Sequence, residues 1–225
     1  TDRMGVQQLA YAPVAGGLVF ASNLDVLAGH PNVGIGIAPQ AIYRYAVNAV
    51  SPAPETIYSG VAKLLPAHRL DWRARSPARP RAYWTPPPAG RAAGRPQELA
   101  AELRTRLDAA VAGVLAADPG RPTGAFLSGG LDSSVVAGLL GRQVAGAAPA
   151  FTIAFEDPRF DESEYAALAA AHFGLQHHVR RMLPDDAVDL VPTLAAACDE
   201  PFGNSSLLPA YICARTARAA GVELL

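Results

Sequence analysis

The stretch Phe126-Leu127-Ser128-Gly129-Gly130-Leu131-Asp132-Ser133-Ser134 decides the fold class of this chain. It joins a short apolar run at residues 124–127 to a longer run at 131–143, so the pattern predicts a strand, a tight turn and a helix. Glycines let the backbone approach an anion closely, and the free N–H groups at a helix N-terminus bind anions. Three serine hydroxyls add donors, and the stretch therefore predicts a phosphate-binding loop.

Asp132 stands inside this predicted loop, where phosphate groups would repel a bare carboxylate. A Mg²⁺ ion between the two would remove the repulsion, so we expect Asp132 to be a metal ligand. The loop has neither the Gly-Lys-Ser/Thr ending of a Walker P-loop nor the Gly-x-Gly-x-x-Gly pattern of a dinucleotide turn. A plain glycine-rich turn with a serine cap is the alternative interpretation, and the full string in its strand–turn–helix context favours the phosphate loop.

The residues around the loop alternate between helix and strand patterns. Because helices separate the strands, we expect a parallel sheet with helices on both faces, which is an α/β fold. The expected strands are 124–127, 150–155 and 177–180, and the expected helices are 97–117, 131–143, 161–173, 185–198 and 205–220.

Prolines gather between residues 52 and 96, where regular structure is therefore disfavoured. The segment 85–90, Thr-Pro-Pro-Pro-Ala-Gly, is typical of a stiff polyproline linker. We expect a first domain at 1–85, a linker at 86–95 and a second domain at 96–225. Within the first domain, the pattern predicts strands at 6–11 and 18–21 with a turn at Gly16-Gly17, a helix at 39–50 and a strand at 68–72.

Composition excludes several classes of protein. Of the 225 residues, 50% are hydrophobic and 17% are charged, which excludes wholesale disorder. A formal net charge of -1 argues against a broad electrostatic contact with nucleic acid, and no apolar run approaches the roughly 20 residues of a membrane span. The two cysteines, Cys198 and Cys213, suit neither a disulfide scaffold nor a metal site. We expect a cytoplasmic protein with no nucleic-acid or membrane partner.

Longer strings carry a resemblance to known families. The Ser-Gly-Gly-x-Asp-Ser-Ser loop resembles the pyrophosphate-binding loop of the N-type ATP pyrophosphatases. Four further segments resemble the synthetase domain of glutamine-dependent asparagine synthetases: 150–166, 172–178, Asp199-Glu200-Pro201-Phe202 and Asn204-Ser205-Ser206. Residues 56–68 with Tyr83-Trp84 resemble the junction between the two domains of that family. Residues 2–9 resemble the family's late glutaminase segment, Asp-Arg-x-Gly-x-x-x-Leu.

The resemblance implies a fold and an activity. The fold would be a partial α+β glutaminase-type segment of the N-terminal-nucleophile class, followed by a parallel-sheet α/β ATP pyrophosphatase domain. Family members convert aspartate and ATP to β-aspartyl-AMP and pyrophosphate, and ammonia from glutamine then attacks the intermediate. The implied ligands are ATP, Mg²⁺, aspartate, and glutamine or ammonia, and the implied partner is a second copy in a homodimer.

The same resemblance assigns site residues. Ser128, Gly129, Gly130 and Ser133 would cradle the ATP phosphates, and Asp132 would bind Mg²⁺. Leu127 and Ile153, at the ends of adjacent strands, would contact the adenosine, although a plain place in the strand core explains them equally well. Asp2 would match the carboxylate that holds the glutamine α-amino group, or it is a turn aspartate. The aspartate carboxylate attacks ATP directly, so we identify no catalytic side chain.

The sequence departs from the family at both ends. The family's glutaminase needs an N-terminal cysteine, and here Thr1 stands at a position that matches the interior of that domain. Residues 222–225 resemble the strand that leads into a Ser-Gly-x-Gly-x-Asp-Glu loop with further ATP contacts. We therefore expect a fragment cut at both ends, which by itself binds ATP weakly and does not synthesise asparagine.

Two other functions remain open. One is an amide-forming adenylase of secondary metabolism, similar to a β-lactam synthetase, and the other is a non-catalytic ATP-binding module. The Asp-Glu-Ser-x-Tyr-Ala and Asp-Glu-Pro-Phe strings favour the asparagine synthetases. We expect His177 and His178 at a strand surface. Glu200 lies in an expected loop, and we favour a position for it outside the ATP site.

Overall fold

The computed structural model describes residues 1–73, 78–88, 90 and 94–225. The linker expected at 86–95 includes residues 89 and 91–93, which lie outside the described residues. The chain forms two compact units, Thr1–Ala89 with Pro192–Asn204, and Gly90–Val191 with Ser205–Leu225. The domain limits at 85 and 96 stay a prediction.

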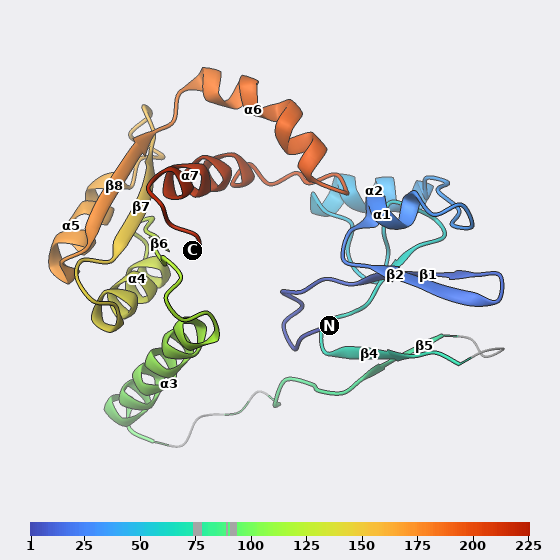
Figure 1. The fold of residues 1–225 in the computed structure, drawn as a ribbon, viewed down its shortest axis with the longest axis horizontal. Helices are drawn as coiled ribbons and strands as arrows, with labels where there is room; N and C mark the ends of the chain where they lie inside the picture. Colours follow the sequence, from blue (N-terminus) through green and yellow to red (C-terminus); the bar gives the residue numbers. More distant parts are fainter. Residues whose placement is uncertain (74–77, 89, 91–93) are drawn as a thin grey trace. The chain divides into compact units, whose positions relative to one another are not determined.

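The first unit contains a small antiparallel sheet in the order β2-β1-β3 (Figure 1). Strands β1 (Ala10–Val14) and β2 (Gly17–Ala21) form a hairpin, and β3 (Ala62–Lys63) pairs with the other edge of β1. Helices α1 (Leu24–Ala28) and α2 (Pro39–Asn48) follow the hairpin, and β4 (His68–Asp71) pairs with β5 (Arg79–Ala82). The buried core of the unit is the set Ala10, Ala12, Leu24, Leu27, Val33 and Val61.

Two expectations for this hairpin are wrong. The first strand begins at Ala10 rather than at residue 6, because the Asp2 carboxylate accepts the N–H groups of Val6 and Gln7 and holds them in a local turn. The hairpin turn lies at residues 15–16, one position earlier than expected. Gly16 has φ +74°, the left-handed conformation that the second central residue of a type II turn requires.

The second unit is built on a parallel sheet in the order β6-β7-β8, which confirms the expected α/β fold. Strand β6 (Ala125–Phe126) pairs with β7 (Pro149–Ala154), and β7 pairs with β8 (Gln176–Arg181). The helices of this unit are α3 (Pro96–Ala117), α4 (Leu131–Gln143), α5 (Ser163–Phe173) and α7 (Leu207–Ala219). Helix α6 (Pro184–Ala197) contains the boundary between the two units.

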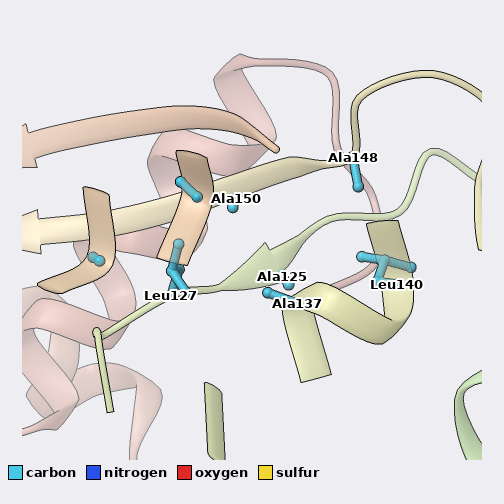
Figure 2. Packing of buried hydrophobic residues seen from close by; sticks show 8 residues of the cluster. Ala125, Leu127, Ala137, Leu140, Ala148 and Ala150 are labelled. Carbon is cyan, nitrogen blue, oxygen red and sulfur yellow. The ribbon is translucent and has the colours of Figure 1, made fainter. Parts of the chain in front are cut away.

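Helices cover both faces of the parallel sheet (Figure 1). On one face, α4 and α5 pack against β6 and β7 through Ala125, Leu127, Ala137, Leu140, Ala148, Ala150, Ala166 and Ala170. Figure 2 shows labelled members of this cluster gathered between the strands and α4. On the other face, α7 packs through Cys213 and Ala217 against Phe151 and Val222. The small side chains allow the helices to approach the sheet closely.

The segment after α7 returns to the free edge of β6. Gly124 N–H donates to Leu224 O at 2.8 Å, and Thr123 and Leu224 form an isolated parallel bridge. Val222 is buried. The strand expected at 222–225 is therefore present as one bridge on this edge. Among the described residues, the structure has no helix that is long and apolar enough to cross a membrane.

Candidate functional site

The predicted phosphate-binding loop leaves the sheet at the C-terminal end of β6. The ladder between β6 and β7 ends at the pair Phe126 and Phe151. Leu127 N–H still donates to Phe151 O at 2.8 Å, and α4 begins at Leu131. Ligands of parallel sheets bind beyond this edge of the strands, so the loop lies where an α/β fold places its ligand.

Hydrogen bonds inside the loop centre on the Ser133 hydroxyl. Ser133 Oγ accepts the Ser128 N–H at 3.1 Å and donates to Gly130 O at 3.2 Å. Because the single Ser133 proton is used there, the Ser128 hydroxyl donates to Ser133 Oγ, at 2.9 Å. Gly130 N–H donates to Ser128 Oγ at 3.3 Å. The structure thus brings together the two serines expected to bind phosphate.

Helix α4 begins without a side-chain cap. Its N-cap residue is Gly130, which has no side chain to accept an N–H of the first turn. The free N–H groups of a helix N-terminus carry partial positive charge. They give the loop donors for a phosphate group, whereas the Ser128 and Ser133 hydroxyl protons are engaged within the loop in this structure.

Gly129 brings the loop against the start of α5. Its φ is +85°, and a Cβ atom at this position would lie 2.8 Å from Ala166 N and 2.9 Å from Glu162 O. Only glycine fits both this conformation and this contact. The backbone of α5 therefore fixes the height of the loop above the sheet.

Asp132 is exposed in the first turn of α4. No group of three or more His, Cys, Asp or Glu side chains among the described residues is arranged to hold a metal ion. Mg²⁺ in nucleotide sites uses one or two carboxylates together with phosphate oxygens and water, so a single aspartate beside the loop suits it. A first-turn aspartate also stabilises the helix dipole. Binding of Mg²⁺ by Asp132 stays a prediction.

A cavity of about 230 Å³ opens beside the loop. The structure brings three of the predicted contacts, Leu127, Ser128 and Ile153, into its wall. The rest of the wall is mainly apolar and consists of Phe126, Phe151, Phe155, Phe160, Glu162, Pro209, Ala210 and Cys213. Such a wall, with a few polar groups at one end, is typical of a site for a small organic ligand.

Leu127 and Ile153 serve the core as well as the cavity. Leu127 is only 1% exposed and belongs to the cluster under α4 (Figure 2), and Ile153 packs against the cluster under α7. Burial raises the pKa of the Cys213 thiol in the same wall to about 11. This cysteine is therefore neutral near pH 7 and contributes an apolar surface.

Asp2 lies in the first unit and caps a local turn. Its carboxylate accepts the N–H groups of Met4, Val6 and Gln7 at 3.0, 3.2 and 2.7 Å. These hydrogen bonds, the one from Gln7 above all, hold the pKa of Asp2 below its usual value. A carboxylate has about four acceptor positions, and three are used here. The turn interpretation has this direct support, whereas a contact with glutamine stays a prediction.

The sequence did not reveal a largely buried ion pair in the first unit between Lys63 and Glu200. Glu200 Oε1 also accepts Ile57 N–H at 2.7 Å, and Lys63 Nζ donates to Ser51 O at 2.7 Å. The neighbouring Asp199 accepts the N–H of Leu24, at the start of α1, at 2.7 Å. Glu200 is thus engaged within the first unit. No spacing rule could pair two residues 137 positions apart.

Two family models match the chain. The model described as asparagine synthase matches residues 102–225, and the model described as a glutamine amidotransferase domain matches residues 1–84. These two matches confirm the families expected from the motifs.

Curated relatives match nearly the whole chain. A putative glutamine-hydrolyzing asparagine synthetase of Mycobacterium tuberculosis is 32% identical over 96% of this chain and 34% of its own length. Glutamine-hydrolyzing asparagine synthetase 1 of Bacillus subtilis is 25% identical over 96% of this chain and 34% of its own. A Penicillium rubens protein named Amidase chyE is 30% identical over 80% of this chain and 29% of its own. The chain spans about a third of the length of these relatives.

Proposed function

The chain belongs to the asparagine synthase family, and we propose that its second unit binds ATP for the adenylation of a carboxylate. One observation carries this proposal: an uncapped, serine-rich helix N-terminus at the end of β6 stands beside a largely apolar cavity. The first feature suits phosphate groups and the second suits a nucleoside. Ser128 contributes both to the phosphate loop and to the cavity wall, so one ligand with a phosphate part and a nucleoside part would span the two features.

In the proposed reaction, the side-chain carboxylate of aspartate attacks the α-phosphorus of ATP, and the bond to pyrophosphate breaks. Ammonia then attacks the acyl carbon of β-aspartyl-AMP, and AMP leaves with the electron pair of the acyl–oxygen bond. The chain's own contribution is positioning. Ser128, Gly129, Gly130 and Ser133 form the loop that receives the phosphates, and Leu127 and Ile153 hold the adenosine. Binding of a phosphate by the two hydroxyls requires their protons to turn away from Ser133 Oγ and Gly130 O. Asp132 would hold Mg²⁺, which neutralises phosphate charge when bound.

The ammonia source in this proposal is glutamine. Residues 1–84 match a glutamine amidotransferase domain, and the relatives from M. tuberculosis and B. subtilis are named as glutamine-hydrolyzing. Asp2 is the residue of this segment that we propose to lie near the glutamine amino group.

A second candidate is an adenylase that forms another amide, as a β-lactam synthetase does. We keep this candidate because one of the relatives does not bear the name of an asparagine synthetase. The two candidates share the ATP site and differ in the carboxylate. A sulfamate analogue of β-aspartyl-AMP tests them in a titration of the 225-residue chain. We expect it to bind at least tenfold more tightly than ATP, because it resembles the reaction intermediate. A matched analogue with an acetyl group that binds equally well would contradict aspartate as the substrate.

We expect Asp132→Asn to weaken the binding of Mg-ATP about tenfold, because a neutral amide is a poorer ligand for Mg²⁺ than a carboxylate. Isothermal titration with ATP should show this loss in Mg²⁺, and almost none in EDTA.

Asp185→Asn is the matched control, since Asp185 is also an exposed acid in the first turn of a helix. It should leave both affinities unchanged. An equal loss in EDTA and in Mg²⁺ for Asp132→Asn would contradict its role as a metal ligand.

A further inference from the structure

A side-chain hydrogen bond holds the carbonyl group at the entrance of the phosphate loop. Thr152 Oγ1 lies 2.6 Å from Leu127 O and 2.7 Å from His177 Nε2. Thr152 is buried on β7 with 3% exposure, and His177 is half-buried on the neighbouring strand β8. The three groups form a chain that runs across the sheet toward the loop.

The donor and the acceptor in each of these hydrogen bonds follow from the number of protons available. Thr152 has one hydroxyl proton, and Leu127 O can only accept. If the proton pointed to His177, two oxygens without a proton between them would lie 2.6 Å apart, which is repulsive. Thr152 therefore donates to Leu127 O and accepts from His177, so the imidazole carries a proton on Nε2.

The series of hydrogen bonds continues into the loop through one peptide group. Leu127 C=O and Ser128 N–H belong to the same planar unit and point in opposite directions in a trans peptide. Fixing the carbonyl toward Thr152 therefore fixes the N–H on the other side, where it donates to Ser133 Oγ at 3.1 Å. One peptide group and the Thr152 hydroxyl thus link the N–H that contacts Ser133 to a histidine on β8.

We propose that His177 and Thr152 are positioning residues that set the geometry of the phosphate-binding loop. This inference rests on the proposed binding of ATP. Neither residue lines the cavity wall, so both act through the Leu127–Ser128 peptide. The Leu127 carbonyl needs such a support because the last pair of the β6–β7 ladder is Phe126 and Phe151, one residue earlier.

The first test compares two ligands, Mg-ATP and adenosine, on the 225-residue chain. Thr152→Val keeps the side-chain shape and removes the hydroxyl, and we expect it to weaken Mg-ATP about tenfold and adenosine less than twofold. Thr152→Ser keeps the hydroxyl and should restore the affinity for Mg-ATP. Two results would overturn the positioning role. In the first, Thr152→Val binds Mg-ATP as tightly as the unaltered chain does; in the second, it loses as much affinity for adenosine as for Mg-ATP.

Thr216→Val is the matched control. Thr216 Oγ1 on α7 donates to a backbone carbonyl, Ile212 O, at 2.8 Å, and it lies outside the loop and the cavity wall. Removal of the Thr216 hydroxyl should leave the affinity for Mg-ATP unchanged. If Thr152→Val does not fold, His177→Leu against His177→Gln gives the same comparison, since glutamine keeps an N–H donor.

The second test does not depend on any ligand. Nitrogen NMR shifts of the His177 ring in the free chain should show a neutral imidazole protonated on Nε2, and Thr152→Val should alter them. A ring protonated on Nδ1 would overturn the inference. If the ring is protonated on Nε2 but neither the unaltered chain nor any variant binds Mg-ATP, the proposed function fails, and the positioning role falls with it.

Discussion

Gly129→Ala is expected to lower the free energy of unfolding by about 3 kcal/mol and to abolish measurable binding of Mg-ATP. Two costs combine. The φ of +85° disfavours any residue with a Cβ, and the new atom would come within 3 Å of backbone atoms of Glu162 and Ala166. Because backbone cannot move aside as a flexible side chain can, the loop and the start of α5 must separate. Urea unfolding and isothermal titration measure the two effects.

Gly146→Ala separates strain from contact. Gly146 lies in the same unit with φ +83°, and nothing lies within 4 Å of the position of its Cβ. This control should cost only about 1 kcal/mol, the conformational penalty alone, and should leave ATP binding unchanged. Equal losses for the two variants would show that the contact between Gly129 and α5 does not support the loop.

Lys63→Met is expected to destabilise the first unit by about 3 kcal/mol, because it leaves the Glu200 carboxylate buried without its counter-charge. The two side chains are only 14% and 13% exposed. The double variant Lys63→Met/Glu200→Gln removes the orphaned charge and keeps an acceptor for the N–H of Ile57, so it should recover a large part of the loss. Urea unfolding of the single and double variants gives the coupling between the two residues.

An exposed ion pair provides the comparison for Lys63 and Glu200. Arg44 and Glu55 lie 2.9 Å apart with side chains 41% and 39% exposed. Arg44→Met should cost less than about 1 kcal/mol, as surface pairs usually do. A loss for Lys63→Met no larger than this would contradict a structural role of the buried pair. Such a role matters because Glu200 and Asp199 attach residues 192–204 to the first unit.

Local patterns were sufficient to predict most elements of the second unit. Helix α4 covers the expected 131–143, and β7 and β8 each differ from the expected strand by one residue at either end. Turn residues mark where these elements start: Gly130 directly precedes α4, Pro149 begins β7, and Gly174 stands two residues before β8. The predicted start of the first strand was wrong because the Asp2 carboxylate accepts N–H groups that the pattern assigned to a sheet.

The site was predictable only in part. A strand–loop–helix pattern places Leu127, Ser128 and Ile153 at one edge of a parallel sheet, and the structure gathers them around one cavity. The sequence predicted a strand surface for His177, whereas its ring is half-buried and hydrogen-bonded to Thr152, 25 positions away. The Lys63–Glu200 pair was missed for the same reason. Such contacts depend on how strands and loops meet in space, which periodicity does not encode.

The most direct test of ATP binding is an amide NMR titration of the 225-residue chain with Mg-ATP. We expect saturable shifts at Gly129, Gly130 and Ser133 for the phosphates and at Ile153 for the adenosine. Adenosine alone should shift Ile153 and leave the three loop amides nearly unchanged. The absence of shifts in the loop at millimolar Mg-ATP, or shifts confined to residues 1–73 and 78–88, would contradict a phosphate-binding site between β6 and α4.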